Sequence, residues 1–182
     1  MNLSQAEVLK PYVGSVISEI KDLRKENKVI LFEGAQGALL DYSLGTYPYV
    51  TSSNSSLGGI SSGVGISPTD MDYSLGISKA YCSRVCEGPF PTEMGGRVEK
   101  YISKKGNEIG STTGRPRRCG WLDAVLLAHS VYLNGVSGLC LTKIDVLDGL
   151  KKIKICVDYS SELTMEEILE SLLLEKVEPQ YI

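Results

Sequence analysis

Short apolar runs recur along this chain and are separated by segments with helical spacing. The runs at 29–32, 138–141 and 154–157 each have the length and the apolar character of a buried strand. Apolar residues at helical spacing predict helices over 96–105 and 120–134. Strands that alternate with helices are typical of α/β proteins. We therefore expect an α/β fold with a mostly parallel central sheet flanked by helices.

The other expected elements are shorter or interrupted. They are a helix over 4–27 broken at Pro11, a helix near 70–77, a strand near 80–85 and a helix over 164–174. Thr164 is expected to cap the last of these helices, because a threonine hydroxyl can accept a hydrogen bond from the first turn. The two glutamates that follow it favour the positive end of a helix dipole.

Residues 45–68 are rich in Gly, Ser and Thr and carry almost no charge. This composition is typical of a flexible linker. Long structureless loops are uncommon inside compact domains unless they bind something, so a ligand-binding loop is the alternative. The composition alone leaves both interpretations open.

Composition and charge exclude several classes of protein. The chain has 182 residues, 42% of them hydrophobic and 23% charged, and its formal net charge of −3 argues against a general nucleic-acid binder. No apolar run approaches 18 residues, and the first ten residues lack a signal pattern, so we expect neither a membrane span nor a secreted protein. The five cysteines are scattered and have no histidine nearby, which favours reduced thiols over a zinc site.

Residues 142–145 read Thr-Lys-Ile-Asp directly after the apolar run at 138–141. A carboxylate such as that of Asp145 can accept hydrogen bonds from N1 and N2 of guanine, whereas adenine offers neither donor. The alkyl stem of Lys143 can pack over the purine ring with its ammonium at the ring edge. The string predicts a guanine-binding turn, with an ordinary solvated turn as the alternative.

Three arginines fall within four residues of the segment 111–118, which reads Ser-Thr-Thr-Gly-Arg-Pro-Arg-Arg. A guanidinium group can bind a carboxylate or a phosphate through two parallel hydrogen bonds. The helix expected after this segment adds a favourable potential for anions at its N-terminus. The segment therefore indicates an oxyanion-binding loop, with a solvated basic loop as the alternative. A nucleic-acid contact is disfavoured, because no aromatic residues are interleaved with the arginines.

The turn at 33–37 and the polar stretch at 51–54 outline a candidate pocket wall. Gln36 and Thr51 can hydrogen-bond a phosphate or a base without adding charge. No phosphate-binding G-x-x-x-x-G-K-[ST] motif occurs. The one histidine, His129, falls in the middle of an expected helix and is interpreted as a packing or surface residue rather than a general acid or base.

The strings that carry these features resemble one family. Residues 31–41 read Leu-Phe-Glu-Gly-Ala-Gln-Gly-Ala-Leu-Leu-Asp, and residues 45–54 read Gly-Thr-Tyr-Pro-Tyr-Val-Thr-Ser-Ser-Asn. Further matching strings lie at 79–81, 84–85, 88–93, 112–121 and 141–149. In this order they resemble the adenylosuccinate synthetases, most closely over 29–157.

The resemblance implies a carbon–nitrogen ligase of purine biosynthesis. The family joins IMP and L-aspartate with hydrolysis of GTP and with Mg²⁺, giving adenylosuccinate, GDP and phosphate. It implies that IMP is bound by Gln36, Thr51 and Arg115. It implies that aspartate is bound by Ser111, Thr112, Thr113, Gly114, Arg115 and Arg117. It implies that GTP is bound by Arg117, Lys143, Ile144 and Asp145.

The resemblance also implies which parts this chain does not carry. In the family, the general base, the general acid, the glycine-rich phosphate loop and the magnesium ligands all precede the matching region, so no catalytic residue or metal ligand is assigned here. We expect a partial copy of the family fold, with a helical segment at 1–28, a substrate- and guanine-binding region at 29–157 and a helix and tail at 158–182. We expect a cytoplasmic protein that is inactive alone and dimerises as the family does. The alternatives are a non-catalytic chain that binds guanine nucleotide or IMP, and an assembly half that needs a partner chain.

Overall fold

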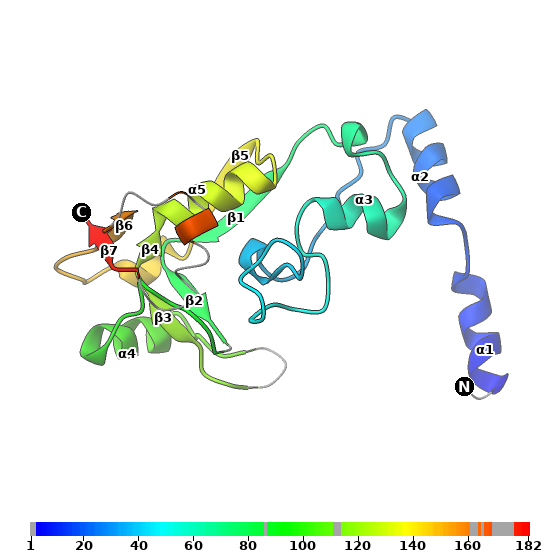
Figure 1. Ribbon diagram of the computed structural model, residues 1–182. Coiled ribbons are helices and arrows are strands. Elements are labelled where there is room, and N and C mark those ends of the chain that lie inside the picture. Colours follow the sequence, from blue (N-terminus) through cyan, green and yellow to red (C-terminus); the bar gives the residue numbers. More distant parts are fainter. Residues whose placement is uncertain (1–2, 86, 111–113, 161–163, 165, 169–176) are drawn as a thin grey trace.

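The structure, a computed structural model, describes residues 3–85, 87–110, 114–160, 164, 166–168 and 177–182. The chain is elongated, with α1 and α2 at one end, the strands at the other and α3 between them (Figure 1). The α-helices are α1 (Leu3–Leu9), α2 (Val16–Lys25), α3 (Gly58–Val64), α4 (Gly96–Lys105) and α5 (Ala124–Leu133). The short 3-10 helices are η1 (Lys10–Tyr12), η2 (Ala38–Leu40), η3 (Pro68–Asp70) and η4 (Ile144–Leu147). The strands are β1 (Leu75–Lys79), β2 (Cys82–Arg84), β3 (Arg118–Gly120), β4 (Leu122–Asp123), β5 (Gly138–Thr142), β6 (Ile155–Tyr159) and β7 (Pro179–Tyr181).

The two N-terminal helices confirm the prediction of helical structure broken at Pro11. This residue stands in η1, between α1 and α2, where it needs no interior helical hydrogen bond. Ser15 caps α2, since its Oγ accepts a hydrogen bond from the backbone N–H of Ser18 at 3.3 Å. An ion pair at 2.9 Å between Arg24 and Asp70 ties α2 to η3.

The prediction of a buried strand at 29–32 is wrong. The backbone there belongs to no strand, Val29 is fully exposed, and Leu31 is 89% exposed. An apolar run becomes a strand only where a second strand completes its backbone hydrogen bonds. Within the described part of the chain, the strands pair with one another and none pairs with this run.

The prediction of a helix near 70–77 is also wrong, because the second half of that segment belongs to β1. This strand pairs in parallel with β5, in a register that runs from Leu75 opposite Gly138 to Lys79 opposite Thr142. The physical reason is that pairing with a distant strand overrides a weak local periodicity. Glycine at position 76 leaves room for this pairing, because a Cβ there would stand only 3.0 Å from a methyl group of Val136.

The α/β class is confirmed, and the described strands divide into three small sheets. β1 pairs with β5 and β4 pairs with β6 in parallel, whereas β2 pairs with β3 and β6 pairs with β7 antiparallel. The strands expected near 80–85, 138–141 and 154–157 appear as β2, β5 and β6, and the helix expected over 96–105 appears as α4. Among the described residues, no helix is long and apolar enough to cross a membrane.

The helix expected over 120–134 begins later than predicted. Asp123 caps α5 by accepting a hydrogen bond from the backbone N–H of Leu126 at 3.0 Å, so the residues before it are free to form β3 and β4. Asp123 is buried, and its carboxylate also accepts a hydrogen bond from the hydroxyl of Tyr159. The burial raises the pKa of Asp123, because a charged carboxylate loses its hydration there.

The expected cap of the last helix is confirmed. The hydroxyl of Thr164 accepts a hydrogen bond from the backbone N–H of Glu167 at 3.3 Å, and the Glu167 carboxylate accepts one from the backbone N–H of Thr164 at 2.8 Å. This reciprocal pair is a capping box. Residues 169–174 of the expected helix lie outside the described residues.

Two apolar clusters form the core at the strand end of the molecule. The first consists of Ala80, Tyr81, Met94, Ile102, Cys119, Val146 and Leu147. The second consists of Leu126, Cys156, Tyr159 and Ile168. The first cluster joins α4 to η4 and to the chain between β1 and β2, and it therefore fixes the residues on which the candidate site is built.

Candidate functional site

A buried carboxylate, Glu108, stands at the centre of the candidate site. Its side chain is only 1% exposed and lies just past the end of α4. Lys79 donates to both of its oxygens at 2.8 and 2.9 Å, and the Tyr81 hydroxyl donates at 2.5 Å. The Lys143 ammonium lies 3.2 Å from the same carboxylate and the Arg117 guanidinium lies 3.5 Å from it. We call these five side chains the Glu108 cluster.

The electrostatics of the cluster keep Glu108 ionised. Burial alone would raise its pKa, but hydrogen bonds and charge from Lys79, with hydrogen bonds from Tyr81 and Lys143, outweigh this effect and lower the pKa of Glu108 to about 2. Burial lowers the pKa of Lys79, and the charge of Glu108 offsets part of that effect. Burial and the hydrogen bond to Glu108 raise the pKa of Tyr81, so the hydroxyl remains a donor.

The predicted guanine-binding turn lies directly against this cluster. Lys143 adopts a left-handed backbone conformation (φ 56°), and its ammonium donates to the carbonyl oxygen of Gly106 as well as approaching Glu108. The far side of the turn is held on α4, because the carbonyl oxygen of Asp148 accepts hydrogen bonds from Tyr101 at 2.5 Å and from Lys105 at 2.8 Å. Asp145 and Ile144, within the turn, are exposed. The turn is therefore fixed on both sides while the carboxylate of Asp145 faces solvent.

The predicted oxyanion loop begins and ends at the same cluster. The backbone N–H of Arg117 donates to the carbonyl oxygen of Glu108 at 2.9 Å, and that of Gly110 donates to the carbonyl oxygen of Arg115 at 2.8 Å. Gly114 has a φ of 65°, which suits glycine. The side chain of Arg115 is exposed. Ser111, Thr112 and Thr113 lie outside the described residues.

The third arginine of this segment has a different environment. Arg118 forms an ion pair with Glu93, in which its Nε donates to one carboxylate oxygen at 2.6 Å. It also donates to the carbonyl oxygen of Gly88 at 3.0 Å and lies over the ring of Phe90. Arg118 therefore contributes to the support of β3.

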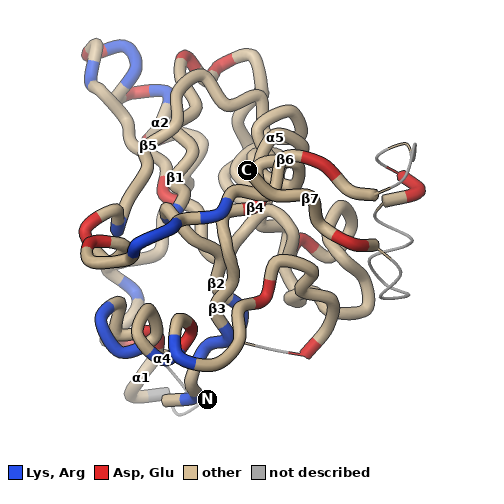
Figure 2. The backbone as a smooth tube through the Cα atoms, turned by 90° about the vertical axis from the view of Figure 1, so that its left-hand side faces the viewer, with Lys and Arg blue, Asp and Glu red and all other residues tan. Residues whose placement is uncertain are grey.

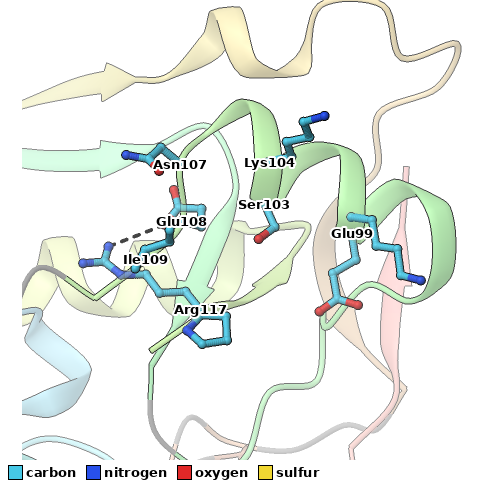
Figure 3. A pocket seen from close by; sticks show the side chains of 9 residues that line it. Glu99, Ser103, Lys104, Asn107, Glu108, Ile109 and Arg117 are labelled. Atoms are coloured by element: carbon cyan, nitrogen blue, oxygen red, sulfur yellow. Dashed lines mark hydrogen bonds and ion pairs between the residues drawn. The ribbon is translucent and has the colours of Figure 1, made fainter. Parts of the chain in front are cut away.

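An open hollow adjoins the Glu108 cluster (Figure 3). It is lined by α4 residues, including Lys100 and Lys104, and by Glu108 and Arg117. The charged ends of Glu108 and Arg117 point toward one another. Its volume of about 580 Å³ lies within the range of small-molecule sites. Basic residues recur along α4 (Figure 2), and the hollow is lined by charges of both signs, with Glu99 and Glu108 beside the lysines and Arg117.

The two remaining candidate residues, Gln36 and Thr51, lie in a loop organised by Asp41. This side chain is fully buried and accepts hydrogen bonds from the backbone N–H groups of Ser43, Leu44 and Ser56 at 2.8–3.0 Å. Although burial opposes ionisation, these bonds lower the pKa of Asp41. We call residues 36–56 the Asp41 loop.

The Asp41 loop places Gln36 and Thr51 on neighbouring segments. Gln36, with a φ of 65°, accepts a hydrogen bond from the Ser53 hydroxyl at 3.2 Å, and the backbone N–H of Thr51 donates to the carbonyl oxygen of Leu40 at 2.7 Å. Arg84 fastens the loop to β2 by donating to the carbonyl oxygen of Tyr49 at 3.2 Å. With α3 also forming in this part of the chain, the linker interpretation of 45–68 is wrong.

Comparison with known proteins identifies the family. A family model described as adenylosuccinate synthetase matches residues 2–182. The chain belongs to the adenylosuccinate synthetase family. Adenylosuccinate synthetase of Hahella chejuensis is 54% identical over 183 residues, covering 98% of this chain and 42% of the relative. That of Pseudomonas aeruginosa is 55% identical, covering 87% of this chain and 37% of the relative. The chain thus spans well under half the length of these relatives.

Solved structures agree with the adenylosuccinate synthetase assignment. The fully ligated adenylosuccinate synthetase of Plasmodium falciparum superposes with a TM-score of 0.88 at 42% identity, covering 96% of this chain and 42% of that one. A succinoaminodeoxyadenylate synthetase of cyanophage S-2L, bound to dGMP and dATP, superposes with a TM-score of 0.50 at 25% identity and covers 60% of this chain and 34% of that one. The fold described above is therefore part of the adenylosuccinate synthetase fold.

Sequence reasoning missed the residues that hold the candidate site together. Glu108 and Asp41 were not identified as buried carboxylates. Lys79 and Tyr81 lie in a string that resembles the family, but no role was predicted for either side chain. One signal was present, since Lys79 and Tyr81 are two residues apart and an extended segment presents such residues on one face. No local signal pointed to Glu108, whose partners are separated from it by up to 35 residues.

Proposed function

We propose that this chain carries the guanine-nucleotide and substrate-anion contacts of an adenylosuccinate synthetase. The reaction joins IMP and L-aspartate with GTP and yields adenylosuccinate, GDP and phosphate. The observation that carries the proposal is the Lys143 turn, whose ammonium is held by Gly106 and Glu108 while the Asp145 carboxylate stays exposed. That arrangement leaves the lysine stem free to pack on a base and the carboxylate free to select guanine.

The anion contacts are proposed for the loop that starts at Glu108. In this proposal Arg115 and Arg117 bind the carboxylates of aspartate together with Ser111, Thr112, Thr113 and Gly114. Arg117 also approaches the phosphates of GTP, and Ile144 borders the base. Gln36, Thr51 and Arg115 bind IMP. Guanidinium groups suit these roles because they pair with oxyanions through two parallel bonds.

The proposed chemistry has two balanced steps. The N1–H of IMP loses its proton as the purine 6-oxygen attacks the terminal phosphorus of GTP, which releases GDP and makes that oxygen part of a leaving group. The amine of aspartate then attacks carbon 6, a proton leaves the nitrogen, and inorganic phosphate departs. The residues assigned above bind and orient these molecules, and none is assigned as the general acid or base.

Magnesium is implied by the family, and its preferred ligands are carboxylate and other oxygen atoms. Among the described residues, no group of three or more His, Cys, Asp or Glu side chains gathers where it could hold a metal ion. Asp41 and Glu108 are each saturated by N–H or O–H donors, which occupy the oxygens that a cation would need. The described side chains therefore do not fit a magnesium site, and none of them is assigned as a magnesium ligand.

The guanine contact can be tested by calorimetry of the purified chain with GDP and with ADP. We expect weak binding that favours GDP, and we expect Asp145→Ala to abolish the preference while leaving ADP binding unchanged. Equal affinities for the two nucleotides would reject the guanine contact. An assay of adenylosuccinate formation from GTP, IMP and aspartate should show no turnover by the chain alone, and clear turnover would show that the catalytic groups are present in it.

A second candidate function, an assembly half that needs a partner chain, is favoured by the exposed apolar run at 29–32. An exposed apolar segment that belongs to no strand is a possible site for strand addition. Analytical ultracentrifugation should then show self-association of the purified chain. A stable monomer at high concentration would count against self-assembly through this run and against a family-type homodimer.

A further inference from the structure

We propose that Glu108 is a positioning residue that couples the guanine-binding turn, at residues 142–145, to the oxyanion-binding loop that ends at Arg117 and Arg118. This inference rests on the proposed function for the ligands but on the geometry of this chain for the coupling. Glu108 contacts the Lys143 ammonium on one side and the Arg117 guanidinium on the other, at 3.2 and 3.5 Å. A change in either cation therefore reaches the other through one carboxylate.

The carboxylate is held rigidly enough to transmit such a change. Tyr81 and Lys79 fix its two oxygens from the β1–β2 side at 2.5–2.9 Å. Its backbone N–H donates to the carbonyl oxygen of Ser103 at 2.9 Å, and its carbonyl oxygen accepts from Arg117 at 2.9 Å. Gly106 completes the fit, because a Cβ there would stand 2.3 Å from the Tyr81 hydroxyl oxygen. Glu108 thus has little freedom to follow one partner without affecting the other.

The balance of charge indicates which contact responds to a ligand. Three cations, Lys79, Arg117 and Lys143, surround one carboxylate, so the cluster has a surplus of positive charge. The Arg117 contact is the longest of the three, and the Nε of Arg117 is buried without a hydrogen-bond partner. A buried donor without a partner is costly, and an anionic ligand at the loop would satisfy it. Arg117 is therefore the cation that turns toward the ligand, and the Lys143 ammonium then pairs more closely with the fixed carboxylate.

The competing explanation is that the cluster only stabilises the fold. A purely structural carboxylate would affect folding and all ligands alike. A positioning carboxylate would change guanine preference and the link between Lys143 and Arg117 in a protein that remains folded. The control is Glu93→Gln, because Glu93 forms an ion pair with Arg118 of the same arginine-rich segment and makes no contact with the cluster in the hydrogen bonds and ion pairs of the described chain.

The first experiment measures GDP and ADP binding by calorimetry in Glu108→Gln, with thermal unfolding as a check on folding. We expect GDP affinity to fall about tenfold, within the usual range of coupling between sites, while ADP affinity changes less than twofold. Glu93→Gln should alter neither affinity. Equal losses for GDP and ADP would overturn the inference. If Glu108→Gln does not fold, Tyr81→Phe removes one hydrogen bond to the carboxylate and should reduce the GDP preference about threefold.

The second experiment needs no nucleotide and separates this inference from the proposed function. The ¹³Cε resonance of Lys143 is followed by NMR in the wild type, in Arg117→Gln, in Tyr81→Phe and in the Tyr81→Phe/Arg117→Gln double variant. We expect Arg117→Gln to shift the resonance, and the shift to shrink when Tyr81 no longer fixes the carboxylate. An unmoved Lys143 resonance in Arg117→Gln would overturn the coupling. Coupling without any GDP binding would instead reject the proposed function and leave the coupling intact.

Discussion

Two parts of this chain are rich in apolar residues, but only one of them buries those residues. Around Glu108, side chains from α4, η4 and the β1–β2 junction, such as Ile102, Val146 and Ala80, pack into one core. At the other end, Val29, Leu31 and several residues of α1 and α2 lie exposed. The two regions have similar residue types, so the difference comes from whether the chain itself supplies a covering surface.

Burial also decides what the charges in each region contribute. The ion pairs of Glu108 lie over the first core, where the low dielectric strengthens both the attraction and the penalty for an unpaired charge. The pair between Lys25 and Asp22 on α2 is just as short, at 2.8 Å, but both side chains are mostly exposed. Surface pairs of this kind contribute little because water screens them. The comparison predicts that removing a charge changes the stability strongly around Glu108 and only slightly on α2.

The largest expected effect is that of Glu108→Ala. Removing this carboxylate leaves Lys79, Lys143 and Arg117 close together without their counter-charge, and we expect the free energy of unfolding to fall by about 3–5 kcal/mol. Asp22→Ala is the control from the exposed region and should change it by about 0–1 kcal/mol. Urea unfolding followed by circular dichroism measures both. Similar losses in the two variants would contradict the contrast drawn between the regions.

Acid should produce the next largest effect. The folded-state pKa of Glu108, about 2, lies below its ordinary value of 4.5, so its stabilisation is present above pH 4.5 and is lost as the pH falls toward 2. The expected loss is up to about 3 kcal/mol, from the size of that shift. Urea unfolding at a series of pH values measures it. Glu108→Gln should flatten most of this dependence, and a smaller slope should remain because the pKa of Asp41 is also lowered.

A smaller effect is expected from Gly106→Ala. The added methyl group would stand 2.3 Å from the Tyr81 hydroxyl oxygen and 2.9 Å from the carbonyl oxygen of Ile102, so the cluster must shift. We expect a loss of about 1–3 kcal/mol, as for other overpacked sites. Gly34→Ala is the matched control, because nothing lies within 4 Å of a Cβ built there. If calorimetric unfolding shows equal melting temperatures for the two variants, the close packing at Gly106 is not as described.

The same contrast explains which parts of the fold could be predicted from the sequence. The helix α4 and the strands β2, β5 and β6 were predicted because their patterns are local and the chain supplies the surface they pack against. Residues 29–32 have an equally clear strand pattern, but a pattern does not provide a partner strand. The strand β1 was not predicted for the opposite reason: it has a partner strand but only a weak local pattern. That partner, β5, lies some 60 residues away in the sequence.

The candidate site divides along a similar line. Lys143, Asp145 and the arginines could be identified because each sits in a short string whose chemistry is readable. Glu108 could not be identified, because its role depends on Lys79, Arg117 and Lys143, which reach it from three separate segments. The same holds for Asp41, which acts on backbone N–H groups that carry no sequence signal. Contacts between distant segments, rather than motifs, hold the predicted residues in place.

The smallest expected effect on stability belongs to Leu31→Lys in the exposed region. Leu31 is 89% exposed and its segment belongs to no strand, so a lysine there loses no packing and should change the free energy of unfolding by less than about 0.5 kcal/mol. The substitution should nevertheless raise the solubility of the chain, because a charge in an exposed apolar run opposes strand addition. Light scattering against concentration measures this, with Glu7→Lys on α1 as a control that adds a lysine outside the apolar run. A gain in solubility for Leu31→Lys alone would show that the run at 29–32 drives association, whereas a large loss of stability would show that Leu31 is covered in solution.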